Sequence, residues 1–164
     1  CLAPGYRVGW VAAGRHAPGL RRLKTLTSLA TAVPSQLAIA EYLAQGGFDR
    51  HLRGLRRQLA AQQARMHALV EAHFPVGTRL ARPQGGYFLW VELPEGGDSL
   101  ALQARAAALG ISLAPGALFS ASGGDRRLRR GLRLNFGHAP GDARIEPALA
   151  ALGRLATAGG TPGT

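Results

Sequence analysis

Acidic side chains are scarce in this sequence. Its 164 residues hold nine Asp and Glu against twenty Lys and Arg, which gives a formal net charge of +11. Such an excess is typical of nucleic-acid-binding proteins, but almost all of it is arginine, with Lys24 the sole lysine. The arginines do not alternate with aromatic residues, as a base-stacking surface requires. We therefore expect solvated basic helix faces, and direct nucleic-acid binding by segments such as Arg126-Arg127 and Arg129-Arg130 stays an alternative.

Cysteine and long apolar runs are also lacking. One cysteine, Cys1, cannot form an internal disulfide, so the sequence favours a protein of the reducing cytoplasm. No apolar run approaches the roughly 20 residues of a membrane-spanning helix, so we expect no membrane partner. No base for the Cys1 thiol can be identified, and we interpret this residue as a spacer instead of a nucleophile.

Motifs for metal and hydrolytic chemistry are absent as well. The five histidines are scattered, with no HExxH pattern and no paired Cys/His spacing, so the sequence predicts no metal site. There is no Gly-x-Ser-x-Gly elbow and no phosphate-binding P-loop. These absences disfavour metalloenzymes, α/β-hydrolases and P-loop nucleotidases.

What the sequence does contain is an alternation of strand and helix patterns. The order predicts the end of one α/β domain in residues 1–47, a small α+β domain in residues 48–157 and a disordered tail in residues 158–164. Residues 78–81 and 87–93 are expected to form an antiparallel pair, and residues 123–130 a polar loop. The other expected strands are 6–13, 111–114 and 132–136, and the expected helices are 20–32, 36–44, 49–73, 98–109 and 140–156.

An arginine inside an apolar strand pattern stands out near the end of the chain. In the run Leu132–Phe136, Arg133 lies between two leucines. A buried guanidinium costs several kcal/mol unless an anion compensates it. The partner is either the carboxylate of a small molecule, which pairs with arginine in a planar bidentate geometry, or one of the few acidic residues of the chain.

Four motifs in a fixed order identify a family resemblance. They are Leu-Ala-Pro-Gly-Tyr-Arg-Val-Gly-Trp at 2–10, Pro-Gln-Gly-Gly-Tyr-Phe-Leu-Trp at 83–90, Ile-Ser-Leu-Ala-Pro-Gly-Ala-Leu-Phe at 111–119 and Leu-Arg-Leu-Asn-Phe-Gly at 132–137. Together they resemble the C-terminal half of fold-type I, pyridoxal-phosphate-dependent aminotransferases of class I/II, over roughly residues 1–157. The resemblance implies an α/β fold, with the end of a large cofactor-binding domain followed by a small C-terminal domain.

The resemblance also assigns roles to particular residues. Arg7 matches the arginine that binds the phosphate of the cofactor, with a surface ion pair as its alternative. Arg133 matches the residue that holds the α-carboxylate of the substrate. Tyr87 falls where the small domain faces the substrate, or else belongs to the core. Asn135 is expected to be a strand residue satisfied by backbone groups.

The Schiff-base lysine of this family precedes the Leu-Ala-Pro-Gly motif, which places it immediately before Cys1. We therefore expect the chain to be a fragment, as its opening on Cys instead of Met also suggests. Lys24 lies on a helical pattern away from the motif and is interpreted as a surface lysine. No catalytic residue is assigned within the chain, and we expect that it neither binds the cofactor covalently nor transaminates on its own.

Within the superfamily, the sequence is most similar to the MocR branch of GntR-type transcriptional regulators, in which an aminotransferase-like domain follows a winged-helix DNA-binding domain. In that case an amino acid or 2-oxo acid acts as an effector, and DNA is bound only by an N-terminal part outside this chain. The alternative is a class I/II aminotransferase acting on aromatic or 2-aminoadipate-like amino acids. Both hypotheses imply pyridoxal 5′-phosphate as cofactor and a homodimer.

Overall fold

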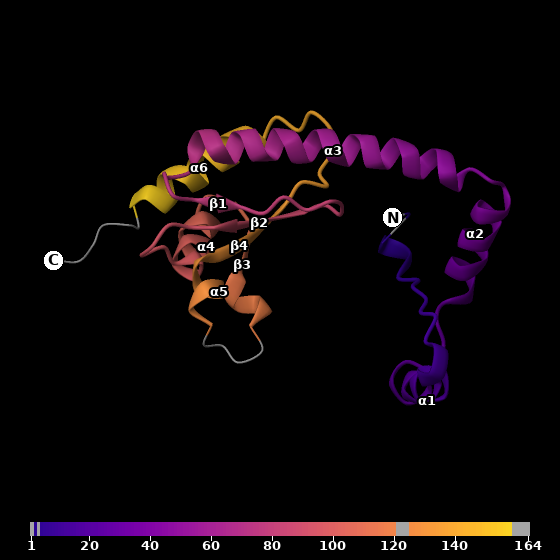
Figure 1. Cartoon of the computed structure of the whole chain (residues 1–164). Helices are drawn as coiled ribbons and strands as arrows, with labels where there is room; N and C mark the ends of the chain where they lie inside the picture. Colours follow the sequence, from indigo (N-terminus) through magenta and orange to yellow (C-terminus); the bar gives the residue numbers. More distant parts are fainter. Residues whose placement is uncertain (1, 3, 121–124, 159–164) are drawn as a thin grey trace. The chain divides into compact units, whose positions relative to one another are not determined.

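The computed structural model describes residues 2, 4–120 and 125–158, without the side chain of Arg126. The described chain falls into two compact units, here called the N-terminal unit (residues 1–55) and the C-terminal unit (residues 56–164). The division lies within helix α3, Phe48–His73, which Figure 1 labels together with the other α-helices and the strands. The expected boundary between residues 47 and 48 stays a prediction, and Cys1 and residues 159–164 of the expected tail lie outside the described residues.

The N-terminal unit consists of short helical elements. They are η1 (Pro4–Tyr6), η2 (Gly14–His16), α1 (Ala17–Thr27), α2 (Val33–Ala44) and the beginning of α3. The strand expected at residues 6–13 is wrong, because Tyr6 ends η1 and residues 7–13 have no regular structure. A strand needs a neighbour for its backbone hydrogen bonds, and no other strand occurs among the described residues of this unit.

Both helices of this unit begin with a proline in the first turn, Pro18 in α1 and Pro34 in α2. The first helical turn tolerates proline because its N–H groups have no helical partner, so Pro34 starts α2 instead of preceding it. Helix α1 ends early, at Thr27, where the N–H groups of Ser28 and Leu29 both donate to the Lys24 carbonyl. Leu29 adopts a left-handed φ of 52°, as in the common helix-terminating turns.

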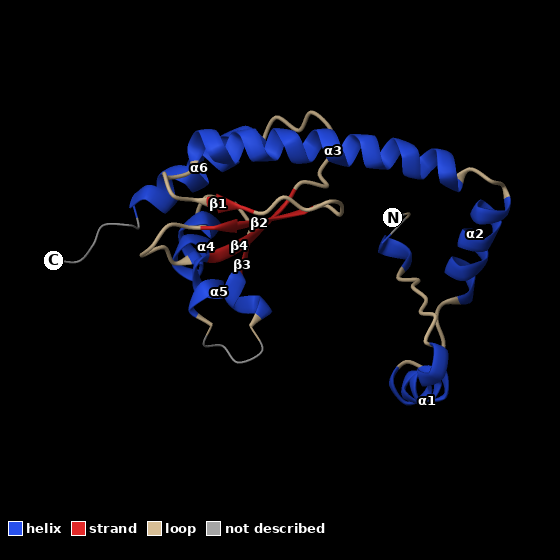
Figure 2. Ribbon diagram, viewed as in Figure 1, coloured by secondary structure: helices blue, strands red, loops and turns tan. Residues whose placement is uncertain are grey.

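The C-terminal unit is built on a four-stranded antiparallel sheet in the order β1-β2-β4-β3 (Figure 2). The strands are β1 (Arg79–Leu80), β2 (Phe88–Glu92), β3 (Ala114–Pro115) and β4 (Gly131–Asn135). The expected antiparallel pairing of the first two is confirmed. Strand β3 lies later than expected, because the N–H of Ile111 is bound to the carbonyl of Ala106 at the end of the preceding helix.

The sheet has two different faces because successive side chains of a strand point in opposite directions. The inner face carries Leu89, Val91, Leu132 and Leu134, all of them buried. This face belongs to the hydrophobic core, which also includes residues of α3, α4 (Ser99–Ala107) and α6 (Ile145–Ala158). The outer face carries the alternate residues, and the candidate site lies there.

Close backbone approaches hold the helices of this unit in place. A Cβ at Gly153 of α6 would overlap the carbonyl oxygen of His73, and one at Gly116 would overlap that of Leu128.

The segment Arg126–Arg130 forms helix α5, so the polar loop expected there is wrong for these residues. Asp125 explains the difference, since its carboxylate accepts a hydrogen bond from the N–H of Arg127 at 2.9 Å and caps the helix.

Candidate functional site

Arg133 lies on β4, a central strand with β2 on one side and β3 on the other. In the register of the sheet it is opposite Trp90 of β2 and Ala114 of β3. Its neighbours Leu132 and Leu134 are buried on the inner face, so the pleat directs Arg133 to the outer face, where it is half-buried. The strand pattern expected from the sequence is therefore present, but the guanidinium is not enclosed by the core.

Two aromatic rings cover the Arg133 guanidinium. Its central carbon, Cζ, lies 4.1 Å from the centre of the Phe88 ring and 4.6 Å from that of the Phe119 ring. Phe88 belongs to β2, whereas Phe119 ends η3 (Gly116–Phe119), which follows β3. The two rings therefore approach from opposite flanks of β4. Such cation–π stacking is electrostatically favourable and orients the planar group.

No carboxylate neutralises this guanidinium within the described part of the chain. The ion pairs found there join Arg65 to Glu146, Arg129 to Asp98, Arg130 to Glu92 and Arg144 to Asp142. The internal salt bridge left open by the sequence is thus not formed among the described residues. Because a partly desolvated cation gains most from an anion that also accepts its N–H groups, a ligand carboxylate fits this position.

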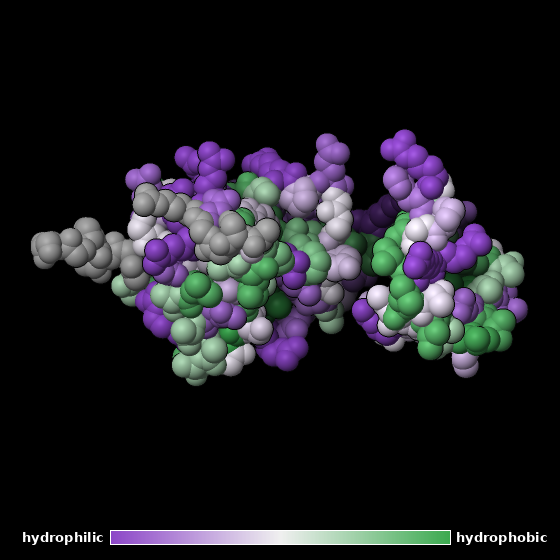
Figure 3. Space-filling model, turned by 90° about the horizontal axis from the view of Figure 1, so that it is seen from below, coloured by the Kyte–Doolittle hydropathy of each residue, from purple (hydrophilic) through white to green (hydrophobic). Residues whose placement is uncertain are grey.

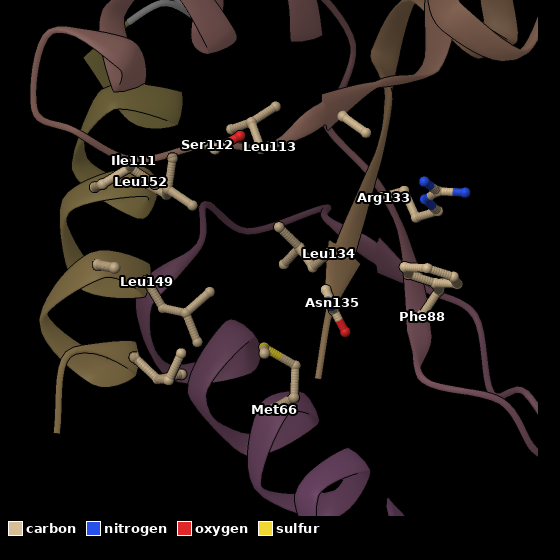
Figure 4. A pocket seen from close by; sticks show the side chains of 13 residues that line it. Met66, Phe88, Ile111, Ser112, Leu113, Arg133, Leu134, Asn135, Leu149 and Leu152 are labelled. Carbon is tan, nitrogen blue, oxygen red and sulfur yellow. The ribbon is translucent and has the colours of Figure 1, made fainter. Parts of the chain in front are cut away.

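A cavity of about 460 Å³ lies beside the strand that carries Arg133. Figure 4 shows that Met66, Leu149 and Leu152 line it on one side of β4, whereas the guanidinium of Arg133 and the ring of Phe88 lie on the other side. Phe88 and Arg133 are both among the residues that line this cavity.

Tyr87 lies next to this arrangement and is not in the core, with 45% of its surface exposed. Its ring centre is 4.7 Å from that of Phe88, and its carbonyl accepts a hydrogen bond from the N–H of Phe136 at 2.9 Å. The side chain of Asn135 accepts a hydrogen bond from the N–H of Gly137 at 2.8 Å. This agrees with the expectation that backbone groups satisfy Asn135. Tyr87 thus stands beside the ring that stacks on Arg133.

Arg7 belongs to the N-terminal unit and is exposed. It has a left-handed φ of 54°, and one guanidinium N–H donates to the Pro4 carbonyl at 3.3 Å. No ion pair involves Arg7 among the described residues, so the surface ion pair that was its alternative is not seen there. Lys24 is an exposed residue of α1 whose ammonium donates to the Thr31 hydroxyl at 3.1 Å, in agreement with a surface lysine.

The arginine-rich segment near α5 is partly neutralised. Arg129 binds Asp98 through two N–H groups, at 3.0 and 3.2 Å, and Arg130 binds Glu92 at 2.8 Å. The hydrogen bond from the N–H of Ala101 is the main cause that lowers the pKa of Asp98. Burial opposes it, and the guanidinium of Arg129 and the N–H of Leu100 lower the pKa further. A direct nucleic-acid surface here would have to compete with these ion pairs.

The aromatic residues around Arg133 were not singled out from the sequence. Phe88 and Trp90 are two residues apart in a strand pattern and so share a face, which was a usable signal. No sequence signal indicated Phe119, because its contact with Arg133 depends on the η3 turn and on the pairing of β3 with β4. Within the described residues, no group of three or more His, Cys, Asp or Glu side chains could hold a metal ion, and none of the described helices is long and apolar enough to cross a bilayer.

The fold and these motifs agree with a family model, Aminotransferase class I and II, which matches residues 2–152. The chain belongs to this family. It corresponds to the C-terminal part of the family pattern recognised in the sequence, and the α/β fold expected from that resemblance is confirmed.

Similar proteins include both regulators and enzymes of this aminotransferase family. The chain is 41% identical to the uncharacterized HTH-type transcriptional regulator YdcR of Escherichia coli over 94% of this chain and 32% of the relative. It is 34% identical to aromatic-amino-acid aminotransferase 1 of Thermococcus litoralis over 85% of this chain and 33% of that enzyme. It thus spans about a third of the length of these curated relatives.

A solved structure supports the same assignment. The α-aminoadipate aminotransferase LysN of Thermus thermophilus, complexed with N-(5′-phosphopyridoxyl)-L-leucine, superimposes with a TM-score of 0.83 and 31% sequence identity. The match covers 96% of this chain and 40% of the enzyme. The two units described here therefore correspond to part of an aminotransferase fold.

Proposed function

We propose that this chain is part of the effector-binding domain of a MocR/GntR-type transcriptional regulator that binds pyridoxal 5′-phosphate and the carboxylate of an amino acid or 2-oxo acid. The observation that carries the proposal is Arg133, a half-buried cation stacked between Phe88 and Phe119 without a carboxylate partner among the described residues. Its free N–H groups suit a planar carboxylate, and Tyr87 borders the same surface. The similarity to YdcR favours a regulator.

The residues present also fit the cofactor. Arg7 is an exposed guanidinium with one hydrogen bond to a backbone carbonyl and no acidic partner among the described residues, as a phosphate ligand requires. When bound, pyridoxal phosphate supplies an electron sink for chemistry at the α-carbon of an amino acid. In this proposal Arg7 holds the phosphate and Arg133 orients the ligand by its carboxylate. The LysN complex, which contains a phosphopyridoxyl adduct of leucine, supports the choice of cofactor.

The second candidate function is transamination of aromatic or 2-aminoadipate-like amino acids. It is favoured by the similarity to the Thermococcus aromatic-amino-acid aminotransferase and to the 2-aminoadipate transaminase of Thermus thermophilus. Under either function we propose a cytoplasmic homodimer. Under the regulator hypothesis we propose that DNA is bound by a separate N-terminal domain.

Binding and turnover in the full-length protein separate these functions. The protein is loaded with pyridoxal phosphate and titrated with L-phenylalanine and L-2-aminoadipate while the absorbance of the cofactor is followed. We expect Arg133→Gln to weaken the binding of whichever amino acid binds by about 100-fold, since loss of one partner of a desolvated charge pair costs about 2–5 kcal/mol. Arg105→Gln, which changes a half-buried arginine of α4, is the matched control and should leave the affinity unchanged.

Turnover is then measured with 2-oxoglutarate as the amino-group acceptor. Binding without sustained turnover, together with a ligand-dependent change in DNA binding, supports the regulator. Sustained turnover without DNA binding supports the enzyme instead. Equal affinities of the wild-type and Arg133→Gln proteins would contradict the carboxylate role of Arg133 under both functions.

A further inference from the structure

We propose that Phe88 and Phe119 are positioning residues that fix the plane of the Arg133 guanidinium, so that only its edge is offered to a ligand carboxylate. This inference rests on the proposed carboxylate role of Arg133. It adds a cause for the orientation of that arginine, because no side-chain hydrogen bond or ion pair of Arg133 is found within the described residues.

The centres of two aromatic rings lie close to the central carbon of the guanidinium. The ring centres of Phe88 and Phe119 lie 4.1 and 4.6 Å from Cζ. Phe88 belongs to β2 and Phe119 to η3, which follows β3, so the rings come from either side of β4. Figure 4 shows the Phe88 ring next to the Arg133 side chain on the outer face of the sheet. The N–H groups of arginine lie in the guanidinium plane, so stacked faces leave them available for a bidentate carboxylate.

The exposure of the two rings argues against an ordinary packing role. Phe88 is 38% exposed and Phe119 is 43% exposed, whereas the core of this unit contains Phe136 with no exposed surface. Neither ring is a member of the buried core cluster. Both instead contact a charged group, which a phenylalanine that only fills the core does not do.

A second layer of contacts fixes the rings themselves. The Trp90 ring meets Phe119 edge to face, with 5.8 Å between centres, and Trp90 lies opposite Arg133 in the sheet. The indole also lies against Gly131, where a Cβ would overlap it. On the other flank, Tyr87 contacts Phe88. Holding a long side chain in one rotamer before the ligand arrives lowers the entropy lost on binding.

The stack is tested first without any ligand. In the ¹⁵N-labelled chain, the Arg133 Nε–Hε signal is assigned from its loss in Arg133→Lys. Ring currents from two stacked faces should displace this signal, and each of Phe88→Leu and Phe119→Leu should return it part of the way to the position of an exposed arginine. Leu118→Ala changes an exposed residue of the same η3 turn and should leave the signal in place. An undisplaced wild-type signal would overturn the proposal.

Ligand binding then separates positioning from simple structural support. Propionate is the probe, with propionamide as its uncharged counterpart, and binding is followed by the same Arg133 signal and by the amide spectrum. We expect Phe88→Leu and Phe119→Leu to weaken propionate binding about 5- to 10-fold and Phe88→Tyr to retain it, because tyrosine keeps the stacking ring. Binding of propionamide should stay weak in every variant.

The outcomes of the two proposals differ. If Arg133→Gln abolishes propionate binding while both leucine variants bind as the wild type does, the positioning role is wrong and the carboxylate role stands. If the stack is seen but Arg133→Gln leaves propionate binding unchanged, the carboxylate role itself is wrong. Unchanged amide spectra of the leucine variants outside the site show that a loss of binding is not due to unfolding.

Discussion

The two units differ in whether they bury their apolar side chains. In the C-terminal unit, fourteen hydrophobic residues form one buried cluster around the inner face of the sheet. In the N-terminal unit, every described side chain is half-buried or exposed, although leucine is frequent there. Trp10 is 90% exposed and Leu26 is 73% exposed. The right-hand part of Figure 3 shows the apolar surface that results.

This difference shows that a helical sequence pattern can specify a helix without providing the surface that buries its apolar face. Helices α1 and α2 form where their sequence favours them, but an amphipathic helix is stabilised mainly by the surface that covers its apolar face. A sheet with one apolar face provides such a surface for α3, α4 and α6. Exposed apolar area of the kind seen in the N-terminal unit is typical of a protein interface.

The largest expected effect contrasts one residue of each unit. Phe136→Ala removes a fully buried ring from the core and should lower the free energy of unfolding by about 3–5 kcal/mol. Leu26→Ala removes an exposed side chain of α1 and should change it by less than about 0.5 kcal/mol. Urea unfolding of both variants is followed by circular dichroism, which reports on the helices of both units. For Phe136→Ala it is also followed by Trp90 fluorescence in a Trp10→Phe background, so that the exposed Trp10 does not add the signal of the N-terminal unit.

A large loss in Leu26→Ala would break the comparison, because it would mean that α1 is buried in the protein in solution. Concentration dependence of that loss would assign the burial to association between chains. A small loss in Phe136→Ala would instead show that the core of the C-terminal unit is not the main source of its stability.

A smaller effect is expected from two helical glycines. Gly153 of α6 faces the His73 carbonyl with no room for a Cβ, so Gly153→Ala should destabilise the C-terminal unit by about 1–3 kcal/mol through overpacking. Gly54 of α3 has open space around the corresponding position, so Gly54→Ala should stabilise its helix by about 0.5–1 kcal/mol. Thermal unfolding followed by circular dichroism compares the two. Equal shifts of both variants would refute the close approach of α6 to the end of α3.

The success of sequence-based prediction follows the same division. The long helix α3 and the pairing of β1 with β2 could be predicted because periodicity, turn residues and burial all agree in the C-terminal unit. The strand expected at residues 6–13 was wrong because the pattern of apolar side chains does not ensure that a second strand is present to pair with it. Helix α5 was missed because four arginines in five residues outweighed the capping signal of Asp125.

The candidate site was predicted in part, for a comparable reason. Arg133 could be singled out because a charge between two leucines in a strand pattern is unusual. Its neighbours could not, since they depend on contacts between segments far apart in the sequence. Phe88 is 45 residues before Arg133 and Phe119 is 14 before it, and only the strand order β2-β4-β3 brings them together. The roles of Arg7, Tyr87 and Arg133 stay predictions.

The smallest expected effect concerns helix capping, which also differs between the units. In the C-terminal unit, the Asp98 carboxylate accepts hydrogen bonds from the N–H groups of Leu100 and Ala101, at 2.9 and 3.1 Å. In the N-terminal unit, the residues before α1 and α2, His16 and Ala32, provide no such bond. Asp98→Ala should therefore cost about 1 kcal/mol at neutral pH, whereas His16→Ala should cost nothing measurable.

The pH dependence of this difference tests its cause. Backbone N–H groups and Arg129 lower the pKa of Asp98 below its ordinary value of 3.8, so the folded state holds the proton less tightly than the unfolded state. The stabilisation is therefore fully present above pH 3.8 and is lost as the pH falls through the lowered pKa of the folded protein. Asp98→Asn keeps the cap but loses the charge, so it should cost less than Asp98→Ala at pH 7 and approach the wild type in acid. A constant difference between Asp98→Asn and the wild type down to pH 2 would show that the charge of Asp98 contributes nothing, whether through the backbone N–H groups or through Arg129. Uncharged capping hydrogen bonds alone would then distinguish α4 from the helices of the N-terminal unit.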